Sequence, residues 1–192
     1  MNLGRERWRL AGQTITWGRA NDKAKAEDEE RRNPGRGGLD WSVPKIGPWF
    51  LFTHVVVASL DVGRLQWSNV VPLWLQVVGL VGFGMSVAML IWAMSVNRFF
   101  SPVVRIQSER GHRIVTDGPY RYVRHPGYTA MLLLGPASCL ALGSLLAFFP
   151  VVAWMVLIIR RTVIEDRVLR ESLSGYREYA DRVRYRLAPQ IW

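Results

Sequence analysis

The chain has 192 residues, a length within the range of a single domain. Hydrophobic residues make up 49% of it, yet the formal net charge is +10. Charged and apolar residues lie in separate blocks, which indicates a membrane protein rather than a soluble one. The basic residues are almost all Arg beside apolar runs, where anionic lipid headgroups account for them, so we expect membrane lipids and no nucleic acid as partners. The single cysteine, Cys139, can form neither an internal disulfide nor a thiolate cluster, and we expect no metal site.

Residues 1–44 form a charged segment in which Lys, Arg, Asp, Glu, Pro and Gly are closely mixed. Such a composition buries too little apolar surface to fold alone, so we interpret this segment as a flexible tail. A regulatory or partner-binding arm is the alternative. Residues 1–45 also lack an apolar signal-peptide core, and we expect no cleavable signal peptide.

Two membrane-spanning helices are predicted within residues 45–97. The first covers about Ile46 to Leu60, and the second covers Val70 to Val96, a run without charge that exceeds the roughly 18 residues typical of a spanning helix. His54 interrupts the first span, and we interpret it as a neutral, hydrogen-bonded packing residue rather than a functional group. The glycines of the segment Gly79–Gly84 predict close packing against another helix.

Residues 98–192 begin with a polar connector, 98–125, and continue with an apolar run from Pro126 to Ile158. As one helix, at ~1.5 Å per residue, this run would extend ~50 Å, well beyond a bilayer core. It must therefore fold back. Gly143 and Ser144 provide the turn, which predicts a hairpin of helices 126–142 and 145–163.

Four spans place both ends of the chain on one side of the membrane. Every Lys and Arg except Arg64 then falls on that side, as the positive-inside rule predicts for the cytosol. The fold class expected is an all-α, polytopic transmembrane bundle of about four helices, with a C-terminal hairpin and a cytosol-facing pocket.

The run Gly118–Tyr128, GPYRYVRHPGY, lies where the connector meets the third span. Pro126 suits the first position of a helix, and we expect the amides of Gly127 and Tyr128 to be free for an anionic group. The hairpin brings Arg161 and Glu165, one helical turn apart, to the same membrane face. Glu165 could there accept an ammonium group.

A ligand with a carboxylate, an ammonium and an aromatic base fits this arrangement, and S-adenosylmethionine has all three. The tyrosines of the run, Tyr120, Tyr122 and Tyr128, offer flat surfaces to a ring or a sulfonium. The alternative is that these residues have no chemical function. In that case the arginines set topology, the tyrosines form an aromatic belt, and Arg161 and Glu165 form a surface pair.

The stretch Arg105–Tyr128, RIQSERGHRIVTDGPYRYVRHPGY, resembles the signature of the integral-membrane methyltransferases that include isoprenylcysteine carboxyl methyltransferase and, more distantly, phospholipid N-methyltransferases. After the predicted hairpin follow an acidic pair, Glu165 and Asp166, and the segment GYREYADRVRYRLAP at Gly175–Pro189. The resemblance covers the chain from about Asn97 onward.

This resemblance implies an S-adenosylmethionine-dependent methyltransferase, embedded in a membrane, that acts on a lipophilic acceptor such as a prenylcysteine carboxylate. Arg161 would face the substrate and orient a carboxylate, and Glu165 could take a proton from an amine. Asp166 stands where a second Glu is more usual, and Ala130 where many members have Gly. The cofactor pocket would be formed by His112, Arg113, Ile114, Val115, Tyr120, His125, Pro126, Gly127, Tyr128 and Glu165.

Other functions fit the same residues. An amine of a phospholipid or a small thiol could be the acceptor, and a non-catalytic membrane scaffold is a further alternative. The sequence does not specify the acceptor, the oligomeric state or the membrane that houses the protein.

Overall fold

The structure, a computed structural model, describes residues 42–102, 111 and 113–192, and all regular structure in this part of the chain is helical. The predicted all-α class is thus confirmed. The predicted tail lies outside the described residues except for its last three, which begin the first described helix. The helical segments are α2 (Ser42–Leu60), the π-helical turn η2 (Asp61–Leu65), α3 (Leu73–Val96), the short 3-10 turn η4 (Gly118–Arg121), α4 (Pro126–Ala141), α5 (Phe148–Ser172) and α6 (Tyr176–Arg182).

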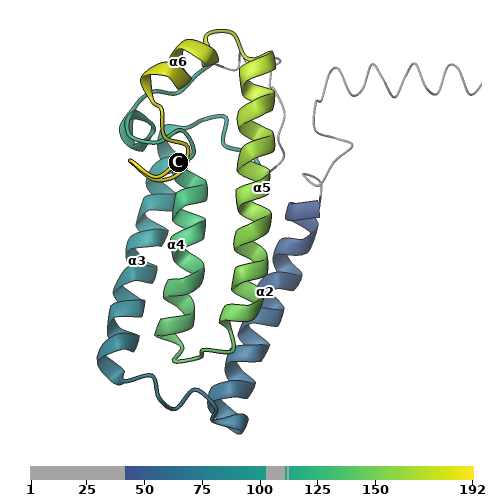
Figure 1. Cartoon of the computed structure of the whole chain (residues 1–192), viewed down its shortest axis with the longest axis vertical. Helices are drawn as coiled ribbons and strands as arrows, with labels where there is room; N and C mark the ends of the chain where they lie inside the picture. The colour runs from purple at the N-terminus through teal and green to yellow at the C-terminus, as the bar shows by residue number, and fades with distance from the viewer. Residues whose placement is uncertain (1–41, 103–110, 112) are drawn as a thin grey trace, which may run out of the picture.

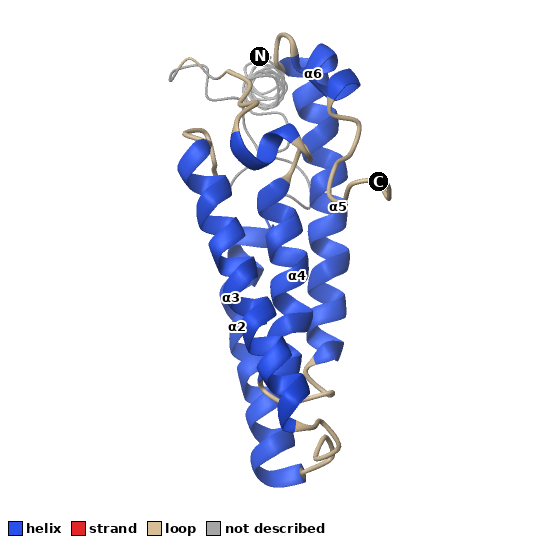
Figure 2. Cartoon of the chain, turned by 90° about the vertical axis from the view of Figure 1, so that its left-hand side faces the viewer, coloured by secondary structure: helices blue, strands red, loops and turns tan. Residues whose placement is uncertain are grey.

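The four long helices form a layer in the order α3, α4, α5, α2 (Figure 1). α3 packs on α4, α4 on α5, and α5 on α2. A view from the side shows that the bundle is narrow and elongated (Figure 2). α6 lies at the end of the bundle where α4 begins and α5 ends (Figure 1).

The closest helix contact joins α3 and α4 through Gly79. A Cβ atom added to Gly79 would lie 2.6 Å from Cβ of Leu140 and would also meet the backbone of Ala141. Gly82 also faces α4, but a Cβ atom added there would make an ordinary contact of 3.5 Å with Cβ of Ala137, and Gly84 faces open space. Of the three glycines in the predicted packing segment, it is therefore Gly79 that allows the helix backbones to approach closely.

The ends of the long helices are tied together away from α6. The buried Asp61 carboxylate accepts hydrogen bonds from the hydroxyls of Ser68 and Ser144, at 2.5 and 2.6 Å. Ser144 lies in the connection between α4 and α5, next to Gly143, whose positive φ of 70° allows the chain to reverse. Asp61 therefore joins the α2–α3 connection to the α4–α5 connection.

Two described helical stretches are long and apolar enough to cross a membrane, Lys45–Leu65 and Leu73–Val96. α4 has 16 residues, fewer than the roughly 20 that a perpendicular span requires. α5 has 25 residues and extends nine residues past the predicted limit of 163, into a charged sequence. This extension carries Glu165 and Asp166 on a continuous helix above the apolar part of the bundle.

His54 lies inside the bundle, as the sequence indicated. Its ring is buried, its Nε2 atom lies 3.0 Å from the hydroxyl of Ser138, and it stacks near Phe50. Its contacts are those of a packing residue that joins α2 to α4.

Candidate functional site

The predicted run Gly118–Tyr128 forms the turn η4 and the start of α4. Pro126 occupies the first turn of α4, as predicted. The amide of Tyr128, however, donates to the carbonyl of His125 at 3.0 Å, so the prediction that this amide is free was wrong. The helix begins with a tight i to i+3 bond that satisfies this group.

The C-terminal segment holds this turn in place through the backbone. The amides of Arg124 and His125 donate to the carbonyls of Tyr185 and Arg186, each at 2.9 Å. The Thr129 hydroxyl donates to the Leu187 carbonyl at 2.6 Å. The segment that follows α6 thus fixes the position from which the His125 side chain enters the site.

The two acidic residues of the predicted pair have different surroundings. The Glu165 side chain is 24% exposed, whereas that of Asp166 is 1% exposed. Asp166 accepts hydrogen bonds from Arg124 at 2.8 Å and from Tyr176 at 3.0 Å. Burial alone would raise the pKa of the Asp166 carboxyl, but hydrogen bonds from His125 and Arg124 hold it well below its usual range. Asp166 is therefore ionised and faces the protein interior.

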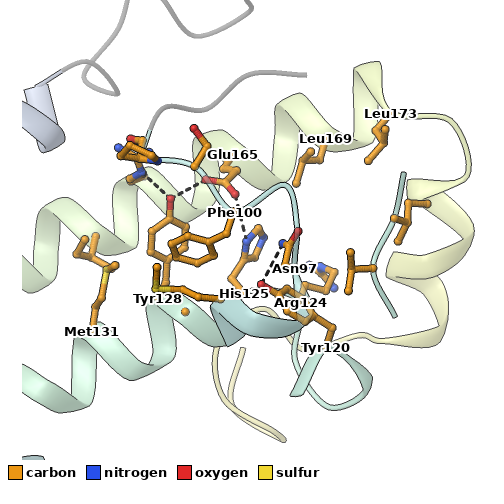
Figure 3. A pocket seen from close by; sticks show the side chains of 18 of the residues that line it. Asn97, Phe100, Tyr120, Arg124, His125, Tyr128, Met131, Glu165, Leu169 and Leu173 are labelled. Carbon is orange, nitrogen blue, oxygen red and sulfur yellow. Dashed lines mark hydrogen bonds and ion pairs between the residues drawn. The ribbon is translucent and has the colours of Figure 1, made fainter. Parts of the chain in front are cut away.

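Glu165 belongs instead to a chain of side chains that includes Tyr128 and Arg161. The Tyr128 hydroxyl donates to Glu165 Oε2 at 2.6 Å and accepts from Nε of Arg161 (Figure 3). Arg161 is buried and also donates to the carbonyl of Pro102. The structure therefore brings Arg161 and Glu165 of α5 together with the start of α4, and the burial of Arg161 excludes a simple surface pair.

Tyr120 is held by contacts from two other parts of the chain. Its hydroxyl accepts from the side-chain amide of Asn97 at 3.0 Å, and its carbonyl accepts from the Tyr179 hydroxyl at 2.8 Å. Burial raises the pKa of Tyr120 to about 12, against the opposing effect of the Asn97 hydrogen bond. Its hydroxyl therefore stays protonated at neutral pH and cannot act as a base.

These residues surround a cavity of about 510 Å³ at the α6 end of the bundle. This volume is within the roughly 300 to 1,000 Å³ of small-molecule sites. Of the predicted pocket residues, Pro126 does not line the cavity and His112 lies outside the described residues. The predicted residues that do line it are Arg113, Ile114, Val115, Tyr120, His125, Gly127, Tyr128, Arg161 and Glu165.

The sequence interpretation missed several lining residues. Leu169 of α5 and Leu173, the residue directly after α5, follow Glu165 at intervals of four, so this spacing could have indicated them. Tyr176 and Tyr179 of α6 complete that wall (Figure 3 shows the leucines). The apolar end of the cavity extends to other elements through Gly47, Met94, Phe100, Met131, Trp154 and Ile158.

The fold and the site define a class: an all-helical protein with membrane-type helices and a cavity, at one end of its bundle, that combines buried charge with an apolar lining. The model of the isoprenylcysteine carboxyl methyltransferase (ICMT) family matches residues 77–171. Over this region the chain is similar to that family.

The similar proteins include two isoprenylcysteine O-methyltransferases and one metal-resistance protein. A probable protein-S-isoprenylcysteine O-methyltransferase of Oryza sativa subsp. indica is 33% identical over 93 residues, which are 47% of this chain and 48% of the relative. The cobalt-zinc-cadmium resistance protein CzcN of Cupriavidus metallidurans is 31% identical over 145 residues, 72% of this chain and 61% of the relative. The protein-S-isoprenylcysteine O-methyltransferase of Schizosaccharomyces pombe is 30% identical over 86 residues, 44% of this chain and 36% of the relative. The chain thus matches between about a third and three-fifths of these proteins' length.

Proposed function

We propose that the protein is an S-adenosylmethionine-dependent methyltransferase that acts on a lipophilic, carboxylate-bearing acceptor of the prenylcysteine type. The observation that carries this proposal is the position of a buried cation and a carboxylate, Arg161 and Glu165, in one cavity whose remaining wall is largely apolar. Similarity to the isoprenylcysteine carboxyl methyltransferase family supports methyl transfer as the reaction.

The polar side of the cavity has groups that fit the cofactor. His125 Nδ1 and Glu165 Oε1 lie 3.9 Å apart, a separation that one hydrogen-bond donor, placed to the side of the line joining them, can bridge. The apolar and aromatic side chains of Ile114, Leu173 and Tyr179 suit a planar base. When bound, S-adenosylmethionine supplies a methyl group on a positively charged sulfur, ready for in-line displacement by a nucleophile.

The acceptor side is assigned to Arg161 and the apolar end of the cavity. A carboxylate acceptor needs no general base, only a cation that orients it, and Arg161 is held for this role by Tyr128 and by the Pro102 carbonyl. The positive charge that disperses during methyl transfer favours a site with little water, which the apolar lining near Met131 and Trp154 provides. A hydrocarbon tail can occupy the same apolar end.

We also propose that all four long helices span the membrane, with the cavity on the cytosolic side. Two of them have the length and hydropathy of spanning helices, and α4 and α5 pack between them in one layer. In the connections at the far end of the bundle, 61–72 and 142–147, Arg64 is the only Lys or Arg. The positive-inside rule then favours the cytosol for the cavity end.

The proposal is tested by cofactor binding and methyl transfer with the purified full chain in detergent. We expect calorimetry to detect S-adenosylhomocysteine binding, and Glu165→Ala to weaken it at least about tenfold because a charged hydrogen-bond partner is lost. Glu171→Ala is the matched control, since Glu171 is an exposed glutamate on the same helix. Wild-type protein that binds no cofactor would overturn the proposal.

The acceptor is tested with labelled S-adenosylmethionine and three acceptors: a farnesylcysteine analogue with a free carboxylate, phosphatidylethanolamine and a small thiol. Label that base releases as methanol identifies an ester and supports the carboxylate assignment. Base-stable label in phosphatidylethanolamine or in the thiol would replace the prenylcysteine acceptor with an amine or a thiol. No transfer to any of them, with cofactor binding intact, would contradict the proposed acceptor and favour a scaffold.

A further inference from the structure

Asp166 accepts hydrogen bonds from three arginines and a tyrosine. Its Oδ2 atom accepts from guanidinium nitrogens of Arg124, Arg170 and Arg186, at 3.2, 3.2 and 3.0 Å. Its Oδ1 atom accepts from Arg124 at 2.8 Å and from the Tyr176 hydroxyl at 3.0 Å. Arginine has no acceptor, and an ionised carboxylate has no hydrogen to donate. Both oxygens of Asp166 therefore act as acceptors.

His125 shares this carboxylate through one ring nitrogen. Its Nε2 atom lies 3.3 Å from Asp166 Oδ1 and 3.5 Å from the Tyr176 hydroxyl. The single hydrogen of Tyr176 is directed at Asp166, which is the closer partner. Because Asp166 can only accept, a hydrogen bond between it and His125 requires the hydrogen on Nε2. In neutral His125, the lone pair is then on Nδ1.

The other ring nitrogen faces the carboxylate of Glu165 at the cavity wall. The distance from His125 Nδ1 to Glu165 Oε1 is 3.9 Å, too long for a direct hydrogen bond (Figure 3). With the hydrogen on Nε2, both of these atoms are acceptors. A group with at least two hydrogens, placed within hydrogen-bond distance of both atoms, would satisfy both, and an ammonium group has three.

We propose that Asp166 is a positioning residue that fixes neutral His125 in the Nε2–H tautomer, so that Nδ1 and the Glu165 carboxylate jointly accept hydrogen bonds from the ammonium group of the cavity ligand. The ammonium site rests on the proposed function, because the ammonium would be that of the amino-acid part of the cofactor. The tautomer of His125 is a property of the free protein. Asp166 thus acts through His125 and does not itself touch the ligand.

The tautomer is measured by nitrogen NMR of the full chain, labelled at its three histidines, in detergent micelles. The spectrum is taken at a pH at which titration shows the rings to be neutral, and His125 is assigned from the signal lost in His125→Gln. We expect a protonated Nε2 and a bare Nδ1. A predominantly protonated Nδ1 in wild-type protein would overturn the proposal.

Two substitutions separate positioning from a purely structural role. Asp166→Glu keeps a carboxylate and should keep the Nε2–H tautomer. Asp166→Asn can present an amide donor to Nε2 and should shift the ring toward Nδ1–H. Asp181→Asn, the same change at an exposed position of α6, should leave the spectrum unchanged. An unchanged tautomer in folded Asp166→Asn would contradict the assignment, and if this variant does not fold, the wild-type spectrum decides alone.

The ammonium site is tested by measuring the binding of S-adenosylhomocysteine and of its deaminated analogue. We expect the wild type to bind the amine about tenfold more tightly, as the loss of a charged hydrogen bond implies. Glu165→Gln and folded Asp166→Asn should lose most of this preference, whereas Asp181→Asn should keep it. Equal affinity of the wild type for both probes would overturn the ammonium site. If neither probe binds, the proposed function fails, while the spectrum still decides the role of Asp166.

Discussion

Glu165 and Asp166 are neighbours in the chain but have different surroundings, Glu165 at the cavity and Asp166 in the protein interior. Successive side chains on a helix are about 100° apart, so one member of an acidic pair can line a cavity while the other is buried. The sequence was enough to predict that Glu165 faces His125 and Tyr128. It was not enough for Asp166, because the donors Tyr176 and Arg186 come from the chain after α5, whose return path to Asp166 no periodicity describes.

At this scale Tyr128 is a residue whose hydroxyl contacts both Arg161 and Glu165. Tyr128→Phe keeps the ring and removes the hydroxyl. We expect S-adenosylhomocysteine affinity to fall about tenfold and methyl transfer to fall further, because both charged groups lose a hydrogen-bond partner that positions them. Calorimetry and initial rates of methyl transfer measure the two effects.

Tyr122→Phe provides the control for that change. Tyr122 lies in the same sequence run but is 65% exposed and does not line the cavity. Loss of the Tyr122 hydroxyl should leave the S-adenosylhomocysteine affinity and the rate of methyl transfer within about twofold of wild type, as is usual for substitutions at exposed sites. If Tyr128→Phe behaves as Tyr122→Phe does, the Tyr128 hydroxyl has no part in the site.

At the scale of elements, the close contact of α3 with α4 lies toward the end of the bundle that is away from the cavity. The glycines of α3 indicated close packing from sequence, but not which of them take part. Gly79 and Gly82 lie on the side that faces α4, while Gly84 lies elsewhere on the helix. The hydrophobic pattern of a uniformly apolar helix does not predict which of its faces packs on a neighbouring helix, because lipid-facing and protein-facing residues are equally hydrophobic.

This difference predicts opposite effects of the same substitution on one helix. Gly79→Ala should lower the free energy of unfolding by about 1 to 3 kcal/mol, because the new methyl group meets the Leu140–Ala141 backbone region. Gly84→Ala should be neutral or stabilising by up to about 1 kcal/mol, because alanine favours the helix and the added methyl group would have no neighbouring atom within 4 Å. Thermal or denaturant unfolding in the same detergent compares the two. Equal effects would show that α3 and α4 are not in this close contact.

At the scale of the whole molecule, the candidate site lies at one end of the helix bundle, and polar contacts join the helix connections at the other end. The far end is joined through Asp61, Ser68 and Ser144, and the site end through the segment 183–187 that pairs with Arg124 and His125. Hydropathy and charge predicted the helices and the end at which the site lies. They gave no sign of the Asp61 contacts, because one Asp and two Ser, 83 residues apart at most, form no recognisable motif.

The orientation of these two ends in the membrane can be measured with single cysteines. Cys139 is fully buried and the only cysteine, so Cys139→Ala provides a background for Arg64→Cys at the far end and Arg182→Cys on α6, both at exposed positions. In sealed cells, an impermeant maleimide should label Arg64→Cys alone, because the positive-inside rule keeps the arginine-rich end in the cytosol. In inside-out vesicles the labelling should reverse. Labelling of both cysteines from the same side would contradict a bundle that spans the membrane with its cavity in the cytosol.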